Sequence, residues 1–219
     1  ALMLVLFALI LRGVSFELRG QVDDPRWRRL WDACIVVGSA APALLFGVAF
    51  ANIFQGIPFD GQGLYHGSLL TLLNPYGLLG GIFFLLLFLH HGALWLAARS
   101  VGDQQARAVR TAAGLWPALL AVAAAFLLAS RYATRLYDNY LAHPGLFAVV
   151  AATVAALVAA RLLLARRAFF RAWAASAATI VGATFFGVIG LYPNLFPSSL
   201  EPAAGLTLPD MLDKLEAND

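Results

Sequence analysis

The segment RWRRLWDACIVVGSAAPALLFGVAFANIFQGIP, residues 26–58, contains the main features of a membrane-spanning helix. Three arginines and two tryptophans open it, an apolar run over 33–54 follows, and the helix-ending sequence QGIP closes it. A helix needs about 20 apolar residues to cross a bilayer, and this run is long enough. Arginine and tryptophan at one end of an apolar run are typical of a cytoplasmic membrane interface. We therefore expect a transmembrane helix that begins on the cytoplasmic side, with Asp32 as its N-cap.

Composition extends this conclusion to the whole chain. The 219 residues are 61% hydrophobic and only 12% charged, whereas soluble domains carry about 25% charged residues. Lipid must therefore cover most of the surface. The net charge of +3 does not indicate nucleic acid, because the arginines lie at the ends of apolar runs. The single cysteine, Cys34, excludes an intrachain disulfide and a thiolate metal site built by this chain alone.

Apolar runs of transmembrane length predict an all-α, polytopic transmembrane helix bundle with five full spans. The runs are 33–54, 75–96, 111–130, 146–164 and 170–191. A shorter run, 1–11, lacks the basic start and the cleavage site of a signal peptide, so we expect it to be a truncated transmembrane helix. The predicted division is a truncated helix (1–11), a cytoplasmic Arg/Trp-rich loop (12–32), a five-helix transmembrane region (33–191) and an extracytoplasmic tail (192–219).

Basic residues fall in alternate gaps between these runs. Twelve of the fifteen lie in or beside the first, third and fifth gaps, and only Arg131, Arg135 and Lys214 lie on the other side. Because cytoplasmic loops are enriched in lysine and arginine, we expect the Arg-rich loops to be cytoplasmic. The strict alternation also supports the number of spans, since omitting one helix would destroy it.

Few side chains within the spans could carry chemistry. His90 and His91 point about 100° apart on a helix, so they cannot hold one metal between them, and packing or hydrogen bonding to a neighbouring helix is favoured over haem ligation. Glu17 permits two interpretations: it belongs to an ion-pair cluster with Arg12 and Arg19, or it is an entry carboxylate for protons. Small-residue faces, such as 38–42 and the glycines at 77, 80 and 81, predict close helix contacts.

Four blocks of sequence follow one another in the order and spacing of a known family. They are RGVSFELR (12–19) with RWRRLWD (26–32), GSAAPALLFGVAFANIFQGIPFD (38–60), LLNPYGLLGG (72–81) with HGALWL (91–96), and YPNLFPSSL (192–200). Together they resemble subunit II of cytochrome bd-type quinol oxidases over residues 12–200.

This resemblance implies a subunit of a terminal oxidase of the bacterial cytoplasmic (inner) membrane, which oxidises quinol and reduces oxygen to water. In that family subunit I carries all three haems, two haem b and one haem d. The resemblance therefore implies no haem ligand, metal ligand or catalytic residue in this chain. Subunit II would support assembly of the haem-bearing subunit and the access of oxygen and protons to its haems. A small single-span subunit and membrane lipid or quinone are further implied partners, and nucleic acid is not.

Six residues match family positions at the partner interface or along the proton or oxygen path: Arg12, Phe16, Glu17, Ser39, Asn52 and Tyr76. The family's first two helices and its last helix are absent from this sequence, so we expect a complete member to have more helices. A transporter or channel subunit is the competing function; it should show buried charges or broken spans in matching halves. A membrane scaffold without a redox role is a further alternative function.

Overall fold

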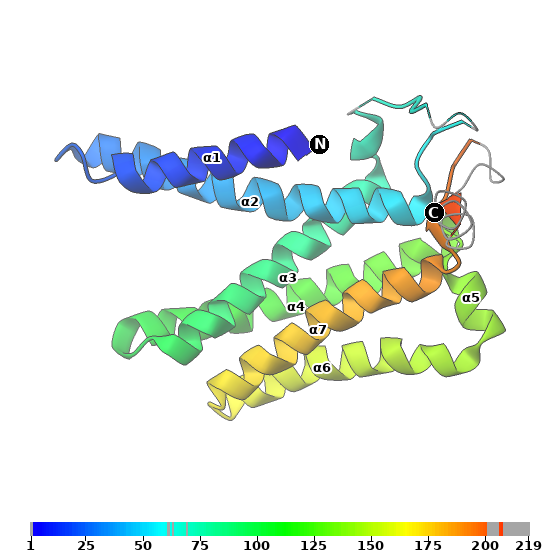
Figure 1. The fold of residues 1–219 in the computed structure, drawn as a ribbon. Helices are drawn as coiled ribbons and strands as arrows, with labels where there is room; N and C mark the ends of the chain where they lie inside the picture. The colour runs from blue at the N-terminus through cyan, green and yellow to red at the C-terminus, as the bar shows by residue number, and fades with distance from the viewer. Residues whose placement is uncertain (1, 61, 63, 69, 201–205, 208–219) are drawn as a thin grey trace, which may run out of the picture.

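The computed structural model describes residues 2–60, 62, 64–68, 70–200 and 206–207. Its helices, in chain order, are α1 (Leu2–Leu18), α2 (Pro25–Gln55), α3 (Pro75–Arg99), α4 (Gly102–Ala133), α5 (Leu136–Ala142), α6 (Phe147–Ala165) and α7 (Phe169–Leu191) (Figure 1). Short 3-10 turns at Thr71–Leu73 and Pro144–Leu146 precede α3 and α6. Two short strands, β1 (Asn194–Phe196) and β2 (Leu206–Thr207), pair antiparallel. Of the predicted tail 192–219, residues 201–205 and 208–219 lie outside the described part.

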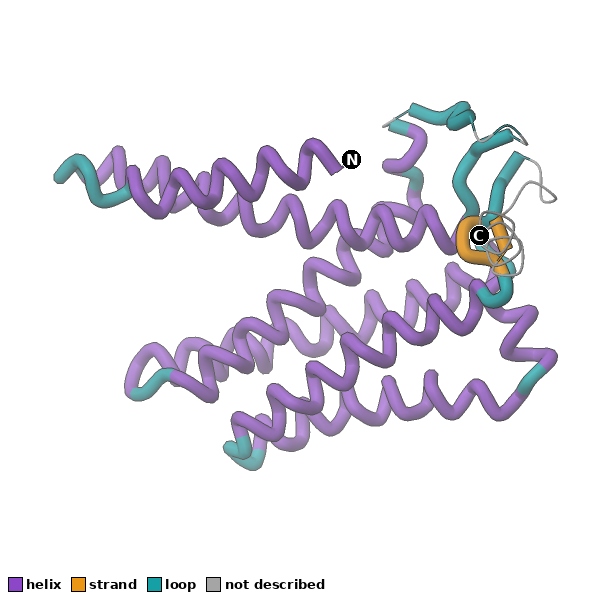
Figure 2. Tube along the Cα trace, in the orientation of Figure 1, coloured by secondary structure: helices purple, strands orange, loops and turns teal. Residues whose placement is uncertain are grey.

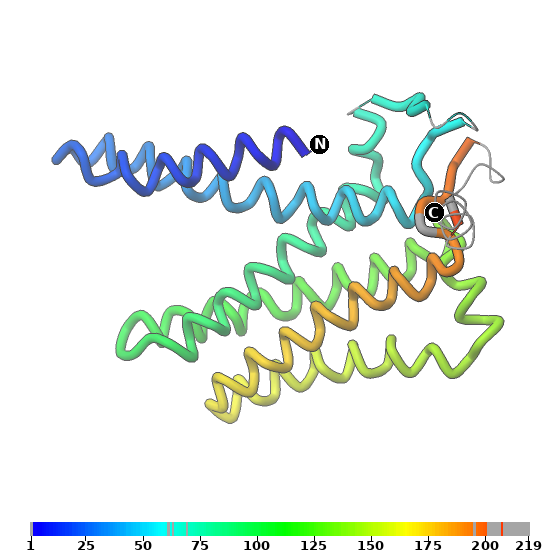
Figure 3. Tube along the Cα trace, in the orientation of Figure 1, coloured from blue at the N-terminus to red at the C-terminus, as the bar shows by residue number. Residues whose placement is uncertain are grey.

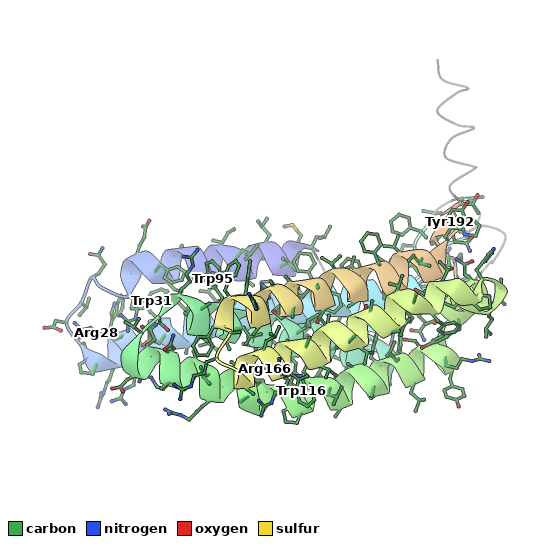
Figure 4. The ribbon with its side chains drawn as sticks, turned by 90° about the horizontal axis from the view of Figure 1, so that it is seen from below. Arg28, Trp31, Trp95, Trp116, Arg166 and Tyr192 are labelled. Atoms are coloured by element: carbon green, nitrogen blue, oxygen red, sulfur yellow. The ribbon has the colours of Figure 1, made fainter. Side chains whose placement is uncertain are left out.

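The five predicted spans are confirmed. The helices α2, α3, α4, α7 and the segment Pro144–Ala165, which contains α6, are each long and apolar enough to cross a membrane. Figure 2 shows the connections gathered at the two ends of these helices. Turns 19–24, 100–101 and 166–168 form what we call the arginine end, and loop 56–74, α5 and the segment after α7 form what we call the loop end. In Figure 4, Arg28, Trp31 and Trp95 lie toward the end opposite Tyr192.

The turn between α1 and α2 differs from the sequence prediction. Helix α1 continues to Leu18, so the segment from residue 12 onward begins as helix and not as loop. Asp32 as the N-cap of the second span was wrong: Asp24 caps α2, and its side chain accepts a hydrogen bond of 2.8 Å from the Arg26 N–H. The reason is that an aspartate followed by Pro25 at the first helical position is a strong start signal, and the polar residues after it continue the helix beyond the apolar run.

Close backbone contacts fix α2 against its neighbours, as the small-residue face predicted. A Cβ on Gly38 would lie 2.7 Å from the Ala8 carbonyl oxygen of α1, and one on Gly80 of α3 would lie 2.6 Å from the Ala51 Cβ. Helix α1 packs chiefly on α2. Figure 3 shows this hairpin diverging from α3 and α4 toward the arginine end, so much of the surface of α1 faces away from the rest of the molecule.

The main apolar core lies among α3, α4, α6 and α7. Phe126 of α4 stacks on Phe83 and Tyr76 of α3, with ring centroids 5.4 and 5.3 Å apart. Leu157 of α6 and Phe186 of α7 complete the same buried cluster. Each of these helices thus packs apolar side chains of one side against its neighbours and leaves those of the other side for lipid.

At the loop end, the connection after α2 is joined to the segment after α7. The Ile57 N–H donates to the Pro197 carbonyl over 2.9 Å, and the Ser199 N–H donates to the Ile57 carbonyl over 3.1 Å. The Ser198 hydroxyl donates to the Phe59 carbonyl over 2.5 Å. Gly56 makes this approach possible with a φ of +97°, a conformation that residues with a Cβ rarely adopt.

Candidate functional site

The six residues singled out by sequence do not form one site. Arg12, Phe16 and Glu17 lie on the last two turns of α1 at the arginine end. Ser39 lies on the half of α2 that packs beside α1. Its residue is exposed, and among the described residues its hydroxyl bonds only to the Ile35 carbonyl of its own helix, at 2.7 Å. The remaining two, Asn52 and Tyr76, are buried near the loop end.

The three α1 residues are exposed, and Arg12 and Glu17 are the charged residues of an otherwise largely apolar helix. The Arg12 guanidinium lies 5.8 Å from the centre of the Phe16 ring, which is 59% exposed. Arg19 pairs with Asp32 at 2.6 Å. Within the described residues Glu17 makes no ion pair, so the expected cluster of Glu17 with Arg12 and Arg19 was wrong. Asp32, across the turn, is the carboxylate that holds Arg19, and Glu17 is left exposed.

Asn52 links α2 to the start of α3. Its side-chain amide donates to the carbonyls of Val48 and Leu72, both at 2.7 Å, and its carbonyl oxygen accepts from the Asn74 amide at 2.8 Å. Asn74 in turn caps α3 by accepting from the Gly77 N–H at 2.7 Å. With 6% of its surface exposed, Asn52 has every polar atom of its side chain hydrogen-bonded, as buried polar groups require. The role that this geometry supports is structural.

Tyr76 links α3 to α4. Its hydroxyl lies 2.8 Å from the Ser130 hydroxyl, which donates to the Phe126 carbonyl at 2.7 Å. Since Ser130 uses its only proton on that carbonyl, Tyr76 is the donor of the pair. The bond satisfies two buried hydroxyls and joins the helices at the loop end.

His91 is held by α7, which confirms the expectation of hydrogen bonding to a neighbouring helix. The Trp173 indole N–H donates to Nε2 of His91 at 3.0 Å, so Nδ1 carries the ring proton and faces the Ser176 hydroxyl at 2.7 Å. Ser176 donates its own proton to the Trp173 carbonyl at 2.8 Å. Both nitrogens of the neutral imidazole are therefore engaged. Trp173 lies 82 positions from His91 in the chain, so nothing in the sequence indicated this pairing.

His90, the adjacent residue, is fully buried, and neither of its ring nitrogens has a hydrogen-bond partner in the described part of the structure. The described residues also hold no group of three or more His, Cys, Asp or Glu side chains placed to bind a metal. The imidazole therefore packs as a neutral, apolar-like ring, an arrangement that costs free energy since a buried polar group is left unpaired.

Comparison with known proteins identifies a family model and several relatives that are similar to this chain. The family model described as "Cytochrome bd terminal oxidase subunit II" matches residues 1–215. The chain is 34% identical over 244 residues to the "Probable cytochrome oxidase subunit 2" of Haemophilus influenzae, covering 96% of this chain and 64% of the relative. It is 33% identical over 207 residues to the "Cytochrome bd ubiquinol oxidase subunit 2" of Bacillus subtilis, covering 94% of this chain and 60% of the relative.

A third relative, the "Cytochrome bd-I ubiquinol oxidase subunit 2" of Escherichia coli K12, is 37% identical over 145 residues, covering 64% of this chain and 38% of the relative. The chain thus spans less than two thirds of the length of each of these relatives. The match of the family model over almost all of its residues nevertheless shows that the chain belongs to the cytochrome bd terminal oxidase subunit II family.

Proposed function

We propose that this chain acts as subunit II of a membrane-bound quinol:oxygen oxidoreductase, in which it supports the assembly of a haem-bearing subunit I. The proposal assigns the two haem b groups, the haem d and quinol oxidation to the partner. A small single-span subunit and bound lipid or quinone complete the proposed assembly. In this proposal the protein lies in the bacterial inner membrane, with its Arg-rich loops on the cytoplasmic side. Family membership does not favour the transporter or channel alternative.

The observation that carries the proposal is the exposed surface of α1. This helix is covered chiefly by α2, and large apolar side chains stand out over the rest of it, including Met3 (62% exposed) and Phe7 (61% exposed). Lipid could cover these, but Arg12 is also exposed and lies six residues before the end of the helix, or about 9 Å along its axis. A lipid-facing arginine there would have to extend toward the interface to keep its charge hydrated, or pair with a polar group. A protein surface can supply one where lipid tails cannot.

The same surface supports a role in moving protons and oxygen. Glu17 is an exposed carboxylate near the arginine end, where cytoplasmic protons would arrive. Phe16 beside it offers an apolar surface over which oxygen can move without a polar motif. Ser39, Asn52 and Tyr76 were the other candidates; the hydrogen bonds of Asn52 and Tyr76 support structural roles for both.

The test is the assembly of the complete oxidase with and without this subunit. In membranes that lack it, we expect the haem absorption of the partner and quinol-dependent oxygen uptake to disappear. Arg12→Ala and Glu17→Ala should reduce the amount of assembled complex or its turnover, whereas Arg110→Ala, an exposed arginine on α4, should not. If a haem-bearing oxidase assembles and turns over normally without this chain, the proposed function is wrong; if only the two variants behave as wild type, the site is wrong and the family role stands.

A further inference from the structure

A cavity of about 50 Å³ lies within the bundle formed by α3, α4, α6 and α7. Its walls are aromatic and aliphatic, with Phe83 and Phe126 on one side and Phe186 and Leu157 on the other. Protein interiors are close-packed, and voids larger than a water molecule are few. Several of its lining residues, among them Phe83, Phe126 and Phe186, belong to the main buried cluster of the protein.

The cavity offers water almost nothing to bind. Two hydroxyls line it, those of Thr153 on α6 and Thr179 on α7. Both donate their protons within their own helices, Thr153 to the Val149 carbonyl at 2.7 Å and Thr179 to the Ala175 carbonyl at 3.0 Å. A buried water normally makes two to four hydrogen bonds, and cavities without such partners stay dry. The site therefore excludes polar ligands.

One side of the cavity is close to the lipid. Val154 on α6 is 41% exposed, and Val150 and Ala123 are half-buried, whereas the wall made by α3 is buried. Helix α6 packs mainly on α7 and only lightly on α4. The shortest way from the hydrocarbon into the cavity therefore lies between α4 and α6, beside Ala123, Val150 and Val154.

We propose that this cavity binds a small apolar gas molecule that enters from the lipid, and that dioxygen is its physiological ligand. The size supports this class of ligand: an engineered apolar cavity of about 150 Å³ binds benzene or xenon, and a site one third as large admits a gas but not a ring or an acyl chain. The choice of dioxygen rests on the proposed function, because oxygen is the apolar gas that such an oxidase consumes. The cavity lies in the α3–α7 bundle and not beside Phe16, so it is a second apolar location for oxygen in this subunit.

Xenon is the probe, and the assembled oxidase containing the complete subunit is the sample. Crystals of the complex pressurised with xenon should show a peak among Phe83, Phe126 and Thr153. Ala123→Leu places a larger side chain in the cavity and should abolish that peak. Ala124→Leu, which adds the same atoms to the exposed face of the same helix, should leave it unchanged. Oxygen uptake at limiting oxygen gives the second measurement: Ala123→Leu should raise the KM for oxygen and leave kcat at saturating oxygen as in Ala124→Leu.

The outcomes separate the site from the function. Absence of a xenon peak from the wild-type cavity, with xenon bound elsewhere in the same crystal, overturns the gas site even if the oxidase depends on this subunit. Ordered water or an acyl chain in the cavity does the same. A xenon peak that Ala123→Leu removes with no change in the KM for oxygen overturns the assignment of dioxygen. If Ala123→Leu fails to assemble, Ala183→Val on α7 narrows the same cavity and serves in its place.

Discussion

Replacing Asn52 by leucine removes the polar connection between α2 and the start of α3 and keeps the number of side-chain heavy atoms. Two hydrogen bonds between these segments are lost, from the Asn52 amide to the Leu72 carbonyl and from the Asn74 amide to the Asn52 carbonyl. The bond to Val48 lies within α2. The substitution leaves the Asn74 amide without its shorter bond, although a bond of 3.3 Å to the Thr71 carbonyl remains.

The expected loss of stability follows from the two bonds between segments. In membrane proteins such bonds contribute about 0.6 kcal/mol on average and about 1.7 kcal/mol at most, so the pair accounts for about 1–3 kcal/mol. For a protein of this size, each kcal/mol corresponds to roughly 2–4 °C in Tm. We therefore expect Asn52→Leu to lower the Tm of the purified complex, followed by intrinsic tryptophan fluorescence, by roughly 2–12 °C. Asn52→Asp should be worse, since a carboxylate would face two carbonyl oxygens.

The matched control is Ser39→Ala on the same helix. Its hydroxyl is exposed and bonded only to its own helix, so the Tm should stay at the wild-type value. An Asn52→Leu complex that melts together with Ser39→Ala would show that the asparagine pair does not hold α3 on α2, and the structural role given to Asn52 would be refuted.

Three other perturbations test separate features. Gly80→Leu should prevent α3 from packing on α2 and abolish assembly, whereas Gly92→Ala, where a Cβ meets no atom within 4 Å, should leave the yield of complex unchanged. His90→Leu removes a buried imidazole without partners and should stabilise the complex by about 1–3 kcal/mol; a lower Tm would contradict the absence of a partner. In the loop 56–74, the hydrogen bond from His66 is the largest cause of a lowered Asp60 pKa. The stabilisation is therefore complete above the ordinary aspartate pKa of 3.8 and is lost as the pH falls through the lower folded value. The protection factors of the amides in this loop, which correct for the intrinsic pH dependence of exchange, should fall below that pH, and Asp60→Asn should remove this fall.

The sequence predicted the spans well and their ends less well, for a physical reason. Apolar runs report the part of a helix that lies in hydrocarbon, so all five spans were found. Helix ends depend on capping, and the Asp24-Pro25 signal lies eight residues before the aspartate that the apolar run indicated. Arginine and tryptophan at the interface fit a helix as well as a loop, so the pattern alone could not separate them.

The contacts of the candidate site residues were harder to predict from the sequence than the spans. That His91 would bond to a neighbouring helix followed from its position in a span, but its partners on α7 are 82 and 85 residues away. Asn52 and Asn74 are 22 residues apart, and their pairing depends on how loop 56–74 brings the start of α3 back to the end of α2. Whether Glu17 pairs with Arg19 also depended on the turn after Leu18. That turn brings Asp32 to Arg19, so Asp32 and not Glu17 forms the ion pair.

The hydrogen bonds between loop 56–59 and residues 197–199 have a consequence for biogenesis. Membrane chains are inserted from the N-terminus as they are synthesised, and domains form in that order. The Phe59 carbonyl therefore reaches its side of the membrane long before Ser198, its partner 139 residues later, has been translated. The hydrogen bonds between the two segments can form only when α7 has crossed the membrane in the correct orientation. These bonds thus report that insertion has proceeded through α7, and an exposed 56–60 segment would mark a chain in which α7 has not yet been inserted.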